Sequence, residues 1–244
     1  MIFRLLFLLL LAPVCQADSP DWKAYNEILI EYVSPGEKNG ISVNLVDYTA
    51  LQGSSDFMDL VAQIREFDVS HLETREEHLA FYINAYNILT IQLIIDHWPV
   101  NSIRDVGNLF RGPWDQTVLT THSKDLTLDN IEHDIIRSYG EPLIHFAVNC
   151  ASVSCPDLRR EAYQADRLNE QLTDQFQTMF QQQRKGAVQK GSTLSVTKLF
   201  KWYASDFEAN GSVESYIRAH FPNLEFSNMK ADLDYDWSLN GVTP

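Results

Sequence analysis

The chain is poor in cysteine and in basic residues. Its 244 residues include three cysteines, Cys15, Cys150 and Cys155, and 19 lysines and arginines stand against 33 aspartates and glutamates. The formal net charge is therefore −14. Because a surface this acidic repels phosphate backbones, we expect no nucleic-acid partner.

Long uninterrupted apolar runs are also scarce, and the clearest one lies at the N-terminus. Arg4 precedes the apolar residues 5–11, and Cys15 and Ala17 place small side chains around a cleavage point after Ala17. This order of segments is typical of a secretory signal peptide. We therefore predict that residues 1–17 are removed and that the mature chain is periplasmic or secreted.

Signatures of cofactor sites are missing from the sequence. It contains no Gly-rich phosphate loop, no Rossmann fingerprint and no Gly-x-Ser-x-Gly elbow, so no cofactor is expected. Cys150, Cys155 and a histidine could supply three zinc ligands, but their spacing is not that of a usual zinc knuckle. We expect no metal site.

The hydrophobic pattern predicts helices and short strands within a single domain. Residues 18–42 form an N-terminal helical arm in this prediction, and residues 43–240 form the domain. A strand or extended arm is expected over 43–48, and a last strand over 235–240. The other predicted elements are helices over 21–33, 54–67, 75–97, 130–139 and 165–183, and hairpins over 117–128 and 187–196.

The helix over 75–97 is apolar nearly all round, which is typical of a buried core helix. Asn84 and Asn87 interrupt its apolar surface, so we expect no membrane span after signal removal. Three residues apart, the two side chains share a helix face, and each buried amide must be hydrogen-bonded or cost about 1–3 kcal/mol. They either satisfy loop backbone, line a site, or do both.

The most informative stretch follows the predicted helix over 130–139. Residues 145–148 have the character of a short buried strand, which ends where Cys150, Ser152 and Cys155 crowd into a loop stopped by Pro156. The two thiols are compatible with two interpretations. One is a reactive site at the end of a rigid element, and the other is a disulfide-closed loop in an oxidising compartment.

A nucleophilic thiol at Cys150 would need a base. On a strand, His145 would face away from Cys150 and lie about 15 Å from it, so we expect His145 to brace the strand. His133, on the preceding helix, can be brought alongside the thiol. Its neighbour Glu132 is three residues after Asp129, the spacing of a helix-capping box.

Four motifs of the chain are FYINAYN (81–87), LDNIEH (128–133), HFAVNCASVSCP (145–156) and FKWYASDF (200–207). Together they resemble the DUF547 family over residues 43–240. Tyr82 stands where that family often has tryptophan. The resemblance implies an α+β domain that is papain-like in outline, with helices packed on a small antiparallel sheet, and that is distantly similar to thiol hydrolases and transglutaminases. Papain-like enzymes carry the cysteine before the histidine, whereas His133 precedes Cys150, so a shared site would be permuted.

Two functional hypotheses follow. The first is an exported cysteine-dependent hydrolase or acyl transferase for peptide amide or thioester substrates, with Cys150 as nucleophile and His133 as base. Backbone N–H groups of residues 150–152 would then stabilise the oxyanion. The second is a non-catalytic extracytoplasmic module that binds a peptide or small thiol, with Cys150 and Cys155 in a disulfide. The residues expected to support or bind substrate are Asn84, Asn87, Glu132, His145, Ser152 and Cys155.

Overall fold

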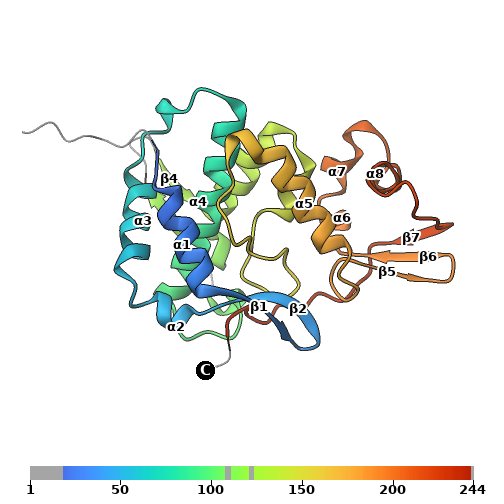
Figure 1. The fold of residues 1–244 in the computed structure, drawn as a ribbon, viewed down its shortest axis with the longest axis horizontal. Coiled ribbons are helices and arrows are strands. Elements are labelled where there is room, and N and C mark those ends of the chain that lie inside the picture. The colour runs from blue at the N-terminus through green and yellow to red at the C-terminus, as the bar shows by residue number, and fades with distance from the viewer. Residues whose placement is uncertain (1–18, 108–110, 121–123, 243–244) are drawn as a thin grey trace, which may run out of the picture.

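The computed structural model describes residues 19–107, 111–120 and 124–242 (Figure 1). The predicted signal peptide, residues 1–17, lies outside these ranges. The described chain is an α+β fold, as the DUF547 resemblance implied. The α-helices are α1 (Trp22–Tyr32), α2 (Tyr48–Leu51), α3 (Ser55–Glu66), α4 (Arg75–Asp96), α5 (Leu168–Phe180), α6 (Leu199–Trp202), α7 (Ala204–Phe207) and α8 (Val213–His220).

Helix α4 forms the centre of the fold, and α1, α2 and α3 pack around it (Figure 1). A capping box begins α4, because the Thr74 hydroxyl accepts from the Glu77 N–H and the Glu77 carboxylate accepts from the Thr74 N–H. By length and composition α4 could cross a membrane, but the rest of the chain buries it along most of its length. It is therefore placed as a core helix.

The strands form separate small sheets rather than the one sheet that was predicted. β1 (Val33–Lys38) pairs antiparallel with β2 (Ile41–Val46), and β3 (Thr117–Thr120) pairs antiparallel with β4 (Asp125–Thr127). In the third sheet β6 lies between an antiparallel β5 and a parallel β7. The bounds of these last strands are Ala187–Lys190 for β5, Thr193–Val196 for β6 and Asn228–Lys230 for β7.

The N-terminal arm joins the main core. Tyr25 and Leu29 of α1 and Val33 of β1 are buried in the same hydrophobic cluster as α4. Pro35 and Gly36 lie inside β1, where they pair with residues of β2. The Pro-Gly pair therefore lies in an edge strand, the sheet position where proline is tolerated.

Short helical turns connect the longer elements. The turn before the cysteine loop, η6, corrects the strand predicted over 145–148. The run is buried all round, and periodicity alone does not distinguish such a strand from a helical segment. Pro142 at the first helical position and the Glu141 carboxylate, which accepts from the Leu143 N–H, start a helical turn instead. These turns are η1 (Val69–His71), η2 (Ile103–Asp105), η3 (Pro113–Asp115), the π-helical η4 (Asn130–Ile135), η5 (Ile136–Tyr139), η6 (Pro142–Phe146), η7 (Ala165–Arg167) and η8 (Glu208–Asn210).

The C-terminal segment returns from β7 to the main body, as Figure 1 shows in red. It was predicted to lie there as a strand, and it makes isolated bridges instead, from Leu239 to Ser152 and from Gly241 to Val46. The Val153 N–H donates to Ser238 O, next to the first of these bridges. The segment therefore covers the loop that carries both cysteines.

Candidate functional site

The two asparagines of α4 hold loop backbone in place. Asn84 donates to Tyr163 O and accepts from the Tyr163 N–H, each at 2.9 Å. Asn87 donates to Ala147 O at 3.0 Å and accepts from the Asn149 N–H at 2.8 Å. This is the first of the two roles expected for them. Through Asn87, the core helix fixes the segment that leads into Cys150.

Asn149 shapes the cysteine loop. Its side chain donates to Pro156 O at 2.6 Å and accepts from the Ala151 N–H at 3.0 Å. Ala151 has a φ of 59°, which a residue with a side chain rarely adopts. The Cys150 N–H donates to Cys155 Sγ at 2.8 Å. Two of the three N–H groups expected to bind an oxyanion are therefore engaged inside the protein.

A buried cation, the Lys185 ammonium, donates hydrogen bonds to the cysteine loop. The Lys185 side chain is 0% exposed, and its Nζ lies 2.7 Å from Asp157 Oδ1. The ammonium also donates to Val153 O at 3.4 Å and to Cys155 O at 3.1 Å. Lys185 thus satisfies backbone on both sides of the loop's end, which is unusual for a residue type that is almost never fully buried.

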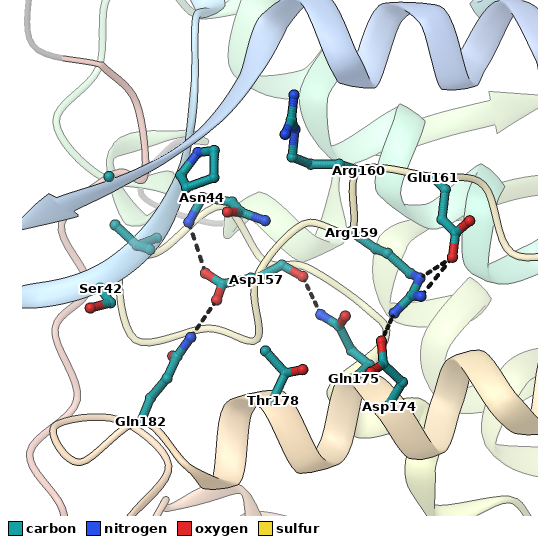
Figure 2. Close-up of a pocket in the computed structure, with 13 residues that line it drawn as sticks. Ser42, Asn44, Asp157, Arg159, Arg160, Glu161, Asp174, Gln175, Thr178 and Gln182 are labelled. Carbon is teal, nitrogen blue, oxygen red and sulfur yellow. Dashed lines mark hydrogen bonds and ion pairs between the residues drawn. The ribbon is translucent and has the colours of Figure 1, made fainter.

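A cleft of about 520 Å³ lies beside this loop, between the β1–β2 hairpin and α5 (Figure 2). Figure 2 shows the Asp157 carboxylate accepting from the Asn44 N–H and from Gln182 Nε2, and Arg159 paired with two carboxylates. In the described part of the chain, no cysteine or histidine lines the cleft. We interpret its polar groups as anchors of the loop.

The Cys150 thiol borders a smaller cavity of about 90 Å³. Glu132, His145 and Cys155 also line it, and most of the remaining wall is aromatic. Trp114, Trp202 and Trp237 are three of the five tryptophans in the chain. The aromatic side chains that line the cavity are Tyr86, Trp114, Trp202, Tyr203, Tyr235 and Trp237.

Hydrogen bonds favour the ionised form of Cys150. Burial alone would raise the pKa of this thiol, but hydrogen bonds with Cys155, Ser152 and Tyr235 outweigh burial and lower the pKa to about 7. Cys150 Sγ lies 3.1 Å from Ser152 Oγ and 3.4 Å from the Tyr235 hydroxyl. Burial and the neighbouring Cys150 sulfur raise the pKa of Cys155. Both cysteines are free thiols in the structure.

His145, rather than His133, lines this cavity. His145 Nε2 lies 2.7 Å from Asp206 Oδ2, and the ring stacks on Tyr203 at 3.7 Å between centroids. Its buried Nδ1 has no hydrogen-bond partner among the described residues. His133 is 34% exposed and contacts Asp129 and Arg137.

His145 was not the expected base, because a strand was predicted between His145 and Cys150. The ring lies on η6, which ends at Phe146 and is followed by a turn. A 3₁₀ turn rises about 2 Å per residue against about 3.3 Å in a strand, so the assumed separation of about 15 Å does not apply. The helical geometry therefore allows both residues to border one small cavity.

Glu132 also differs from its expected role at a helix cap. Asp129 is already helical, and its side chain makes no capping hydrogen bond. The Thr127 hydroxyl accepts from the Asn130 N–H instead. The buried Glu132 carboxylate lines the cavity and accepts from the Tyr203 hydroxyl at 2.7 Å. The π-helical form of η4 accompanies this inward placement, and such segments are frequent at functional sites.

Asp206 completes the environment of His145. Arg137 binds its carboxylate through two hydrogen bonds of 2.7 Å. These bonds and the His145 ring hold the pKa of Asp206 well below its usual range. Burial lowers the pKa of His145 to about 4. At neutral pH we therefore assign an ionised Asp206 and a neutral His145 that donates from Nε2, which leaves Nδ1 as a free acceptor.

Residues 69–179 match the family model described as "Protein of unknown function, DUF547". This segment of the chain is therefore similar to the DUF547 family. No curated protein and no solved structure matches the chain. The DUF547 segment contains α4, His145 and Cys150, whereas Asp206 and Tyr235 follow it in the chain. The cavity is thus built jointly by the DUF547 segment and the residues C-terminal to it.

Several cavity residues were not proposed from the sequence as site residues. Asp206 lies inside a motif that the DUF547 resemblance used, but nothing in its spacing indicated His145 as its partner. Trp114, Tyr235 and Trp237 were assigned to a loop or to the last strand. Exposed or half-buried aromatic side chains in loops were the available signal, because such residues are unusual away from binding surfaces.

The buried neutral His145 makes this protein sensitive to acid. The unfolded chain takes up a proton at this histidine below its ordinary pKa of about 6.5, whereas the folded chain does so only near pH 4. Stability from this group is therefore complete above pH 6.5 and is lost as the pH falls to 4. Between pH 7 and pH 4, we expect a loss of about 3 kcal/mol that His145→Gln does not show.

Urea unfolding of the parent, His145→Gln and His133→Gln at pH 7, 5.5 and 4 checks this expectation. The His133→Gln protein should follow the parent. If the free energy of unfolding falls equally with pH in the parent and in His145→Gln, the assignment of a buried neutral ring is contradicted.

Proposed function

We propose that this protein is a cysteine-dependent hydrolase or acyl transferase that acts on amide or thioester bonds of a peptide or small-molecule substrate, with Cys150 as nucleophile. The observation that carries the proposal is the Cys150 thiol beside the aromatic cavity, with a pKa lowered to about 7. A thiolate is the nucleophilic form of cysteine, so this lowered pKa favours attack by Cys150 near neutral pH.

The chemistry has two steps. In the first, Cys150 Sγ attacks the carbonyl carbon and the bond from that carbon to the leaving nitrogen or sulfur breaks, which forms a thioester. The leaving group takes a proton as it departs. In the second step, water or an acceptor amine attacks the thioester and releases the thiol. Water gives hydrolysis, and an amine gives acyl transfer.

The hydroxyls of Ser152 and Tyr235 support the first step. They lie 3.1 and 3.4 Å from Cys150 Sγ, so they are placed close to a carbonyl carbon bonded to that sulfur. In this proposal they donate to the oxyanion in place of the engaged N–H groups of Cys150 and Ala151.

His145 is the proposed proton carrier. The thiol ionises through its hydrogen bonds to Cys155, Ser152 and Tyr235, so His145 is not required to hold a permanent ion pair with Cys150. Its free Nδ1 takes the proton that the Cys150 thiol loses as it attacks and gives that proton to the leaving group, while Asp206 fixes the ring through Nε2. We propose that this chemistry takes place in the periplasm or outside the cell, following the predicted signal peptide.

The pH dependence of alkylation tests the nucleophile. We expect iodoacetamide to react with Cys150 with a midpoint near pH 7, whereas an unperturbed thiol has a midpoint near pH 8.5. The rate is followed by intact mass on protein purified with reductant, and Cys150→Ser shows which part of the reaction belongs to Cys150.

A matched pair at position 155 tests the physical cause. Cys155→Ala removes a hydrogen bond to Cys150 Sγ and should raise the midpoint, whereas Cys155→Ser keeps a donor and should leave it closer to the parent. A parent midpoint at or above pH 8.5 would remove the basis for an activated nucleophile. A mass increase of two protons on reduction of exported material would favour the disulfide-bonded binding module instead.

A further inference from the structure

The wall of the Cys150 cavity is a continuous aromatic cluster. Ring centroids of Trp202 and Tyr235 are 4.9 Å apart, and those of Tyr235 and Trp237 are 4.5 Å apart. Trp114 contacts Trp237 edge-on at 6.0 Å. Trp202 is 45% exposed, so the cluster reaches from the cavity to the surface. An exposed tryptophan at a cavity mouth is a site for ligand contact.

The cavity also contains a buried acidic side chain. Glu132 is 5% exposed, and it accepts a hydrogen bond from the Tyr203 hydroxyl. In the described part of the chain, no lysine or arginine lines the cavity. Arg137 interacts electrostatically with Glu132, but its guanidinium donates to Asp206 and contacts His133 rather than forming an ion pair with Glu132. A buried carboxylate without a direct ion pair is costly, so a cationic ligand beside Glu132 would be stabilising.

We infer that the cavity binds an ammonium group, and that the substrate of the proposed reaction carries this positive charge close to the bond that Cys150 attacks. The inference rests on the proposed function. Aromatic faces attract cations through their negative quadrupole, and the Glu132 carboxylate adds a full negative charge at the same place. Both components favour a cation over a neutral group of the same shape.

The size of the cavity limits what enters it. Its volume of about 90 Å³ is well below the roughly 300–1,000 Å³ of sites that enclose a whole small ligand. A primary or quaternary ammonium at the tip of a chain fits this restriction, and the remainder of the substrate lies outside along Trp202. The overall net charge of −14 also favours the approach of a cationic substrate.

Choline and its neutral isostere 3,3-dimethylbutan-1-ol are suitable probes, because they share a shape and differ in charge. Each is titrated into the parent protein at pH 7, with tryptophan fluorescence and the rate of Cys150 alkylation as readouts. We expect choline to shift the fluorescence and slow alkylation at a concentration at least about tenfold lower than the isostere requires.

Variants locate the binding. Glu132→Gln and Trp202→Leu should each weaken choline binding by about threefold to thirtyfold, and neither should change the response to the isostere as strongly. The matched controls are Glu208→Gln at an exposed position and Trp22→Leu at a half-buried one. Both lie outside the cavity and should bind choline like the parent.

The comparison of the two probes on the parent protein stands even if a variant fails to fold. Equal potency of choline and the isostere would overturn the inference, because the cavity would then bind by shape and apolar contact and not by charge. Absence of protection by choline would overturn it as well. The pH midpoint of Cys150 alkylation without a probe tests the proposed nucleophile separately. If that midpoint is near pH 7 and choline does not bind, the ammonium inference is refuted and the proposed function is not.

Discussion

Replacing Lys185 with methionine should lower the free energy of unfolding by about 3–5 kcal/mol. The ammonium is fully buried and lies 2.7 Å from Asp157 Oδ1. Its removal leaves a buried carboxylate without its cation and deprives the carbonyls of Val153 and Cys155 of a donor. Methionine has a similar length, so the expected loss comes from the uncompensated polar groups rather than from a large cavity.

Urea unfolding at pH 7 measures this loss. The matched control is Lys190→Met, an exposed lysine of β5, which should stay within about 0.5 kcal/mol of the parent. A second variant, Lys185→Met with Asp157→Asn, removes both charges and should recover part of the stability, because Asn44 and Gln182 still contact position 157. A loss below about 1 kcal/mol in the single variant would mean that Lys185 does not hold the loop.

The longer helices could be predicted from the sequence because several independent signals agreed. The apolar pattern over 75–97 corresponds to α4 (Arg75–Asp96), and a capping box fixes its start. The pattern over 54–67 corresponds to α3 (Ser55–Glu66), where the Ser54 side chain caps the first turn. A long period-3.6 pattern with a cap leaves few alternatives.

The short elements were less predictable for a physical reason. The run over 145–148 is buried on all sides, so its burial pattern has no period that separates strand from helical turn, and η6 formed where a strand was expected. The division into separate sheets depends on which strands meet in space. That choice is made by tertiary packing and is not visible in local periodicity.

The sequence predicted the residues next to Cys150 in the chain but not the site residues that long-range contacts bring to it. The crowding of thiols and hydroxyls around Cys150 was visible in the sequence, and Ser152 and Cys155 do contact Cys150. The partners supplied by long-range contacts were not visible. Tyr235 reaches Cys150 across 85 residues, and Asp206 reaches His145 across 61.

The choice between two histidines separates the structural proposal from the sequence hypothesis. In the sequence, His133 was the expected base because the assumed strand placed His145 too far from Cys150. In the structure, His145 lines the cavity with a free Nδ1, whereas His133 is partly exposed and contacts Asp129 and Arg137. Replacing each histidine with glutamine removes the basic nitrogen and keeps an amide of similar length that can still hydrogen-bond.

We expect His145→Gln to slow cleavage of an amide by about 10²- to 10⁴-fold, the range typical of a lost general acid–base group, and His133→Gln to change it by less than about threefold. Acetyl-p-nitroanilide and p-nitrophenyl acetate make the test specific, because the anilide needs a proton on its leaving nitrogen and the phenolate leaves without one. His145→Gln should therefore slow cleavage of the ester by less than about tenfold.

Acylation of Cys150 is followed by intact mass, and Cys150→Ser gives the background rate for both substrates. Equal losses on the ester and the anilide would indicate a disturbed nucleophile rather than a lost proton carrier. A large loss on the anilide for His133→Gln, with His145→Gln close to the parent, would contradict the structural assignment and return the role of base to His133.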